Sequence, residues 1–122
     1  MSMLTPLEAA AWLFGIAALG GIAQALIRFS GRPYPPAWLS MLHGMLAAAG
    51  LTLMLYAACT TGVPDLAKLS IALFVVAAAG GAFLNLRYHM HSQPLPKGIM
   101  IGHALLAVAA YACLLLALRP AV

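Results

Sequence analysis

Residues 13–26, LFGIAALGGIAQAL, and residues 73–86, LFVVAAAGGAFLNL, carry Leu, Phe, Ala and Gly at the same places, 60 residues apart. The match continues without a gap, so that residues 9–58 align with residues 69–118. A chain rich in Ala and Leu matches itself by chance, so the informative pairs are those of rarer residues: Gly20/Gly80, Gly21/Gly81, Pro36/Pro96 and His43/His103. Repeats of this kind build two similar halves that meet around a shared site.

The composition is that of an integral membrane protein. Hydrophobic residues make up 65% of the 122-residue chain, and six basic and two acidic side chains are too few for a soluble surface. About 20 apolar residues cross a bilayer. The sequence predicts four such spans: Leu7–Ile27, Trp38–Cys59, Leu69–Leu86 and Ile99–Leu118. We interpret the first as a retained helix, because no basic segment precedes it and no cleavage site follows it.

We therefore expect an all-α fold, a single transmembrane domain over residues 1–122 made of two tandem helical hairpins. The first repeat covers about residues 7–59 and the second about residues 67–119. Short connections favour an up-down-up-down bundle, in which the first and third helices are diagonal, and so are the second and fourth. A pseudo-two-fold axis along the membrane normal then carries His43 onto His103 at equal depth.

The charged residues predict the orientation and exclude one class of partner. The connections that follow the first and third spans hold four basic residues, and the opposite side holds two. Basic residues concentrate on the cytoplasmic side, so we expect a bacterial inner-membrane protein with both termini in the periplasm. The basic residues are dispersed over loops, which argues against nucleic acid and leaves membrane lipid as the expected partner.

Ionisable side chains within a membrane span are candidate functional residues. His43 lies about 8 Å, and Gly21 about 10 Å, below the inner boundary of the bilayer. All four helices thus present a histidine or a Gly-Gly pair at nearly one level, with the histidines on one diagonal and the glycines on the other. For the glycines, close packing of helices through small residues remains the alternative interpretation.

A flat macrocycle with two axial ligands suits this arrangement. Haem iron takes neutral imidazole at each axial position, and glycine removes the Cβ atoms that would strike a porphyrin. We expect His43 and His103 to ligate the iron of one haem b. The propionates would point to the inner boundary, where Arg28 and Arg87 offer cationic partners. The glycines expected to contact the porphyrin are Gly20, Gly21, Gly80 and Gly81.

With these residues the chain resembles the four-helix core of the cytochrome b family of quinol–cytochrome c oxidoreductases. The resemblance implies axial ligation by His43 and His103 and porphyrin contacts by the Gly-Gly pairs. That family carries two histidines on each ligand helix and two stacked haems, whereas the outer halves of the second and fourth spans hold no histidine. The pattern therefore predicts one haem on the inner side. It also resembles small bacterial four-helix inner-membrane proteins with a P-x-P…H-[GA]-x-L-A element in each half.

The leading functional hypothesis is a single-haem b-type cytochrome that passes electrons between the quinone pool and a partner, or serves as a subunit of a respiratory complex. Nothing resembles a catalytic triad, a P-loop or a hydrolytic acid pair, which favours electron transfer over a stand-alone enzyme. One alternative is an accessory subunit whose histidines only hydrogen-bond within the bundle. Another is a small metal or solute transporter, although Glu8 lies too near the end of its span to couple proton transport.

His89 and His91 end the third span beside Arg87 and Tyr88. We expect them in the headgroup zone, where they are solvated. Contact with a propionate or a quinone is the second interpretation, and a small metal site the third.

Overall fold

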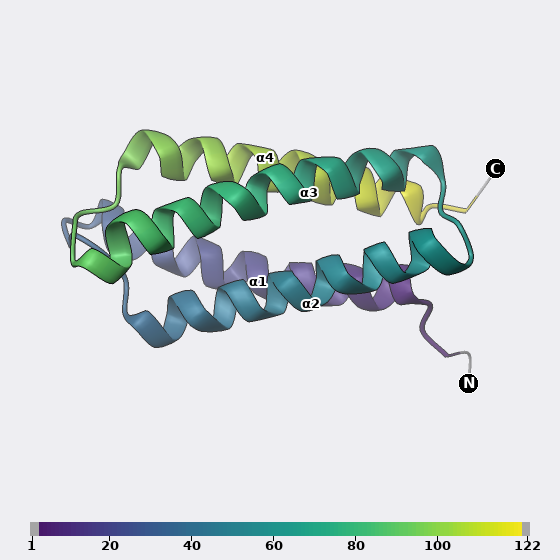
Figure 1. Ribbon diagram of the computed structural model, residues 1–122, viewed down its shortest axis with the longest axis horizontal. Coiled ribbons are helices and arrows are strands. Elements are labelled where there is room, and N and C mark those ends of the chain that lie inside the picture. Colours follow the sequence, from purple (N-terminus) through teal and green to yellow (C-terminus); the bar gives the residue numbers. More distant parts are fainter. Residues whose placement is uncertain (1–2, 121–122) are drawn as a thin grey trace.

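The structure is a computed structural model that describes residues 3–120. All regular secondary structure within those residues is helical. Figure 1 shows the long helices side by side, with both termini at one end of the molecule. We call this the outer end, and we call the end with the connections 30–36 and 92–96 the inner end. The elements are α1 (Pro6–Phe29), α2 (Ala37–Thr60), α3 (Asp65–Phe83), a π-helical turn η1 (Leu84–Tyr88), a 3-10 turn η2 (His89–His91) and α4 (Lys97–Ala117).

The helices begin where local chemistry supplies a start signal. At α1 the Thr5 hydroxyl accepts from the Glu8 N–H at 3.2 Å, and the Glu8 carboxylate accepts from the Thr5 N–H at 2.8 Å. This reciprocal pair is a capping box. The other three long helices each follow a proline, whose fixed φ suits entry into a helix. The four predicted spans are therefore confirmed as helices, with ends shifted by a few residues.

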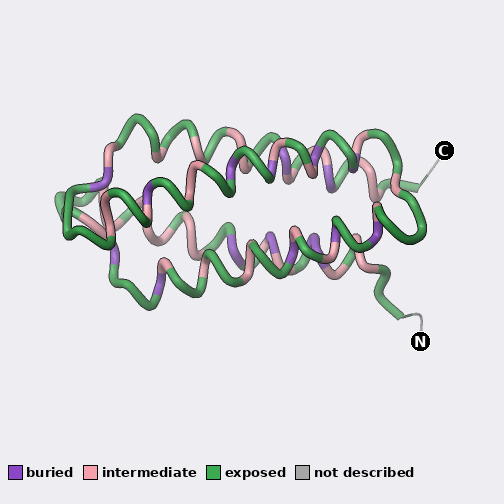
Figure 2. Tube along the Cα trace, viewed as in Figure 1, coloured by how far each residue is buried: buried purple, intermediate pink, exposed green. Residues whose placement is uncertain are grey.

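The four helices are long and apolar enough to cross a membrane, as expected for a multi-pass membrane protein. Large apolar side chains cover the outside: Trp12, Trp38 and Leu105 are each about two-thirds exposed. Figure 2 shows that the buried positions lie on the sides of the helices that face one another. An outer surface of this kind suits a lipid environment.

The packing joins the helices in two pairs. α1 packs mainly against α2, and α3 mainly against α4, with smaller contacts between α2 and α3 and between α1 and α4. The main buried cluster lies toward the outer end and is centred on Phe14 and Phe74. Met54 and Leu114 complete it and are fully buried. This cluster fixes how the α1–α2 pair sits on the α3–α4 pair.

At the inner end the two proline-rich connections are joined to each other. The Leu95 N–H donates to the Pro33 carbonyl at 3.0 Å, and the Arg28 Nε donates to the Leu95 carbonyl at 2.9 Å. Leu95 and Pro35 are buried between the connections. The α1–α2 pair and the α3–α4 pair are thus held together at both ends, which fixes the relative positions of residues between them.

Candidate functional site

The two histidines selected from the sequence lie next to each other inside the bundle. His43 comes from α2 and His103 from α4, and their ring centroids are 6.2 Å apart with planes at 74°. Both side chains are partly buried. The structure therefore brings together two residues that are 60 positions apart in the chain.

A backbone carbonyl fixes each imidazole in the same way. His43 Nδ1 lies 2.7 Å from the Ala17 carbonyl oxygen, and His103 Nδ1 lies 2.7 Å from the Ala77 carbonyl oxygen. A carbonyl oxygen only accepts, so Nδ1 carries the proton and donates it. In the neutral ring Nε2 then keeps its lone pair, which is the state of a histidine that ligates a metal through Nε2.

The Gly-Gly pairs lie against these imidazoles. A Cβ placed on Gly21 would come within 3.1 Å of His43 Cε1, and one on Gly81 within 3.0 Å of His103 Cε1. The nearest atoms to a Cβ on Gly20 and on Gly80 also belong to these histidines, at 3.6 and 3.9 Å. Each glycine therefore packs against the histidine of its own helix pair and leaves room for the ring. This role was not predicted from the sequence. No sequence signal marked this role, because any interval between aligned positions of one half recurs in the other.

The spacing of the rings fits one ion shared by two imidazoles. If both Nε2 atoms pointed at one ion between them, metal–nitrogen bonds of about 2 Å and a ring radius of about 1 Å would set the ring centroids about 6 Å apart. The observed separation is 6.2 Å. Two imidazoles leave further coordination positions to be filled by other groups, and the porphyrin nitrogens of a haem supply them. Two neutral imidazoles are the donor set that haem iron takes at its two axial positions.

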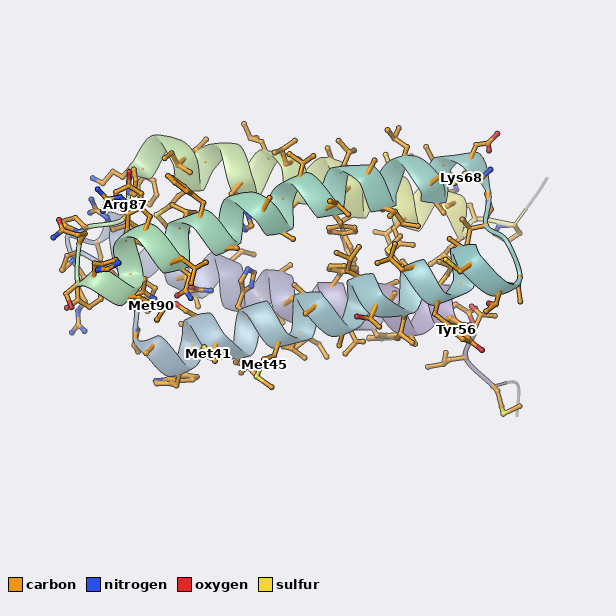
Figure 3. The ribbon with its side chains drawn as sticks, viewed as in Figure 1. Met41, Met45, Tyr56, Lys68, Arg87 and Met90 are labelled. Atoms are coloured by element: carbon orange, nitrogen blue, oxygen red, sulfur yellow. The ribbon has the colours of Figure 1, made fainter. Side chains whose placement is uncertain are left out.

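The two arginines expected near the propionates lie differently. Arg28 is half-buried, and its guanidinium donates to the carbonyls of Leu95, at 2.9 Å, and Arg32, at 3.3 Å. Arg87 is exposed, with its guanidinium 5.4 Å from the ring centroid of Tyr88. Figure 3 shows Arg87 at the inner end, opposite Lys68 at the outer end. Arg28 is therefore held by the inner connections, whereas Arg87 lies on the surface.

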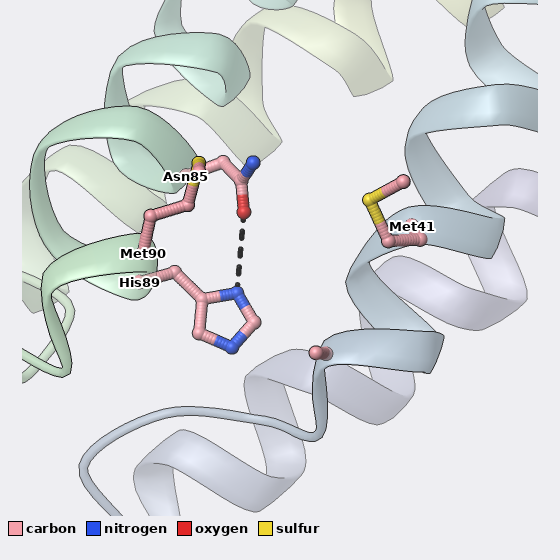
Figure 4. A pocket seen from close by; sticks show the side chains of 5 residues that line it. Met41, Asn85, His89 and Met90 are labelled. Atoms are coloured by element: carbon pink, nitrogen blue, oxygen red, sulfur yellow. Dashed lines mark hydrogen bonds between the residues drawn. The ribbon is translucent and has the colours of Figure 1, made fainter.

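His89 and His91 are in different surroundings from the central pair. His89 Nδ1 lies 3.2 Å from the Asn85 side-chain oxygen, and its ring centroid is 5.4 Å from that of Tyr34. Figure 4 shows His89 and Asn85 facing Met41 of α2 across a surface hollow. His91 is exposed. The four-residue spacing of Asn85 and His89 was the sequence signal for this contact.

The candidate functional site consists of His43 and His103 together with the Gly-Gly pairs that pack against them. Within residues 3–120, no three His, Cys, Asp or Glu side chains are arranged to hold a metal ion. In comparisons with known proteins, no protein-family model, curated protein or solved structure matched the chain.

Proposed function

We propose that this chain is a single-haem b-type membrane cytochrome in which His43 and His103 are the axial ligands. The observation that carries the proposal is the 6.2 Å separation of two imidazoles whose Nδ1 atoms are both held by backbone carbonyls. A haem bound there supplies one-electron transfer. The partners we propose are the quinone pool and the other subunits of a respiratory complex.

The residues of the chain have separate tasks in this proposal. The carbonyls of Ala17 and Ala77 fix the ring orientation and increase the basicity of Nε2, as hydrogen-bond partners of metal-bound histidines do. Gly20, Gly21, Gly80 and Gly81 let the imidazoles lie close to α1 and α3, and they would line the porphyrin. Arg28 and Arg87 supply positive charge at the inner end, where they would pair with the propionates.

The proposal includes a tandem repeat with up-down-up-down topology. It is supported by two kinds of contact that recur 60 residues apart, the histidine–carbonyl bonds and the glycine–imidazole contacts. The equivalent residues Phe14 and Phe74 also stack on each other. The repeat gives the site its two-fold form. We also propose that the inner end faces the cytoplasm of a bacterium and that both termini are periplasmic, because four of six basic residues lie at that end.

The same hydrogen bonds favour a second function, that of an accessory subunit without a cofactor. Each bond ties one helix to its neighbour, α2 to α1 through His43 and α4 to α3 through His103. Hydrogen bonds between membrane helices contribute about 0.6–2 kcal/mol each. In this function the imidazoles stabilise the bundle and nothing more.

An absorption spectrum distinguishes the two functions. The full chain, purified from haem-replete cells, is expected to show a Soret band and sharp α and β bands on reduction. His43→Ala and His103→Ala should each abolish this low-spin spectrum, and His91→Ala, at an exposed position, should leave it unchanged. If the folded protein purifies without haem, the proposal of a cytochrome is wrong. The accessory function then predicts that both histidine variants melt at a lower temperature than the parent.

A further inference from the structure

We propose that the hollow between the start of α2 and the end of the third span binds one Cu(I) ion through Met41, His89 and Met90. This site is separate from the histidine pair and does not depend on the proposed haem. The hollow has a volume of about 160 Å³ and is lined by Ala37, Met41, Asn85, His89 and Met90. Two of these five residues have thioethers and one has an imidazole.

The His89 imidazole is prepared for ligation through one nitrogen. Its Nδ1 lies 3.2 Å from the Asn85 Oδ1, an atom that only accepts, so Nδ1 carries the proton. The lone pair is then on Nε2. Metal-bound histidines usually have such a partner on the other ring nitrogen, and it fixes both tautomer and orientation. Asn85 is thus a positioning residue for His89.

The backbone is distorted at this place. Residues Leu84–Tyr88 form a π-helical turn, the 3-10 turn His89–His91 follows, and Ser92 then has a φ of 53°. It is the only π-helical turn in the part of the chain that the structure describes. Such turns occur mostly as single insertions and frequently lie at functional sites. The distorted segment supplies Asn85, His89 and Met90 to the hollow.

The other half of the repeat lacks the residues that line the hollow. The positions equivalent to Asn85 and His89 are Ala25 and Phe29, and the position equivalent to Ala37 is Lys97. There the Lys97 ammonium lies 5.4 Å from the ring centroid of Phe29. The equivalent corner thus carries a cation–π contact in place of metal donors. The Met and His donors of the hollow therefore occur in one half only, whereas the histidines of the central site occur in both halves.

The donors select a soft cation. Thioether and imidazole ligands suit Cu(I), whereas carboxylates and carbonyls suit Mg²⁺ or Ca²⁺. Neither a carboxylate nor a cysteine lines this hollow. Met41 is 57% and Met90 68% exposed, so neither thioether is enclosed by the bundle. Methionine has a flexible unbranched side chain, which lets both sulfur atoms turn toward an ion at His89 Nε2.

The test is a Cu(I) titration of the full chain in detergent, carried out without oxygen against a chromophoric Cu(I) chelator. The protein carries Cys59→Ser and Cys113→Ser, because both cysteines are free and would compete for the ion. We expect one Cu(I) per chain. Met41→Leu, Met90→Leu and His89→Ala should each weaken binding at least about tenfold, and Asn85→Leu about 10- to 100-fold. Met45→Leu and His91→Ala are the matched controls and should bind as the parent does.

Two results would overturn the site. One is unchanged Cu(I) affinity in all three ligand variants. The other is loss of Cu(I) binding in His43→Ala, which would place the ion at the central pair. Met→Leu exchanges conserve volume, so the methionine variants should fold even where His89→Ala does not. The haem spectrum of each variant is recorded alongside, which separates failure of this site from failure of the proposed cytochrome.

Discussion

Phe14 of α1 and Phe74 of α3 stack with ring centroids 3.7 Å apart and ring planes 5° from parallel. They occupy equivalent positions 60 residues apart, as His43 and His103 do, and they lie nearer the outer end. One aromatic pair thus joins α1 to α3, and one imidazole pair lies between α2 and α4. The positions of the two pairs are linked, because Phe14 also packs against α2 at Gly50.

Gly50→Ala should destabilise the protein by about 1–3 kcal/mol, as overpacking of a core does. A Cβ on Gly50 would lie 2.8 Å from Cε2 of Phe14, whose ring already stacks on Phe74. The measurement is thermal unfolding in detergent. Gly102→Ala is the control, since a Cβ there meets no atom within 4 Å. Equal melting temperatures for the two variants would show that Phe14 adjusts without cost.

Gly21→Leu and Gly81→Leu should reduce haem occupancy, because a side chain there must displace an imidazole. The Cβ alone would come within 3.1 or 3.0 Å of a histidine Cε1. Haem per chain is measured from the absorption of the purified variants. Gly44→Leu, in open space next to His43, should retain the haem. Full haem occupancy in both the Gly21 and the Gly81 variant would contradict the contact between these glycines and the imidazoles.

Arg28→Gln should lower the reduction potential of the haem modestly. Oxidation adds a positive charge to the haem, and removing a nearby cation makes the oxidised form relatively more stable. Screening by solvent and salt limits the size of the shift. A redox titration measures it, and Lys68→Gln at the opposite end should leave the midpoint unchanged. An unchanged midpoint in Arg28→Gln would place the propionates away from the inner connections.

Cys59 provides a test of orientation. It is exposed near the outer end of α2 and is a free thiol. A membrane-impermeant thiol reagent should label it in intact cells of a Cys113→Ser variant, because we propose that the outer end faces the periplasm. Gln93→Cys, at an exposed position of the inner end, should react only after lysis in a chain without the native cysteines. The reverse labelling pattern would invert the topology and leave the ligand assignment unaffected.

The helices could be predicted because the nearby sequence determines both the length of an apolar run and the position of a proline at its start. Pro36, Pro64 and Pro96 each precede a helix, and the apolar runs between polar connections set the lengths. The pairing of His43 with His103 could also be predicted, since the interval of 60 residues relates the two histidines whatever the packing. Equivalent positions in two similar hairpins come to equivalent places.

The contacts within each hairpin could not be predicted. Whether Gly21 faces an imidazole or a cofactor depends on how far α1 is rotated toward α2, and packing over the whole hairpin decides that rotation. The π-helical turn was missed for a related reason. Residues 84–88, LNLRY, contain neither Pro nor Gly, the usual sequence signals of a helix distortion.

Each hairpin contains everything that positions its own histidine: the carbonyl that holds Nδ1 and the glycine that makes room for the ring. A shorter ancestral protein of a single hairpin, dimerised about the same axis, would therefore have presented both imidazoles to one another. In a fused chain either half can change alone, and the two halves differ at His89, whose equivalent is Phe29.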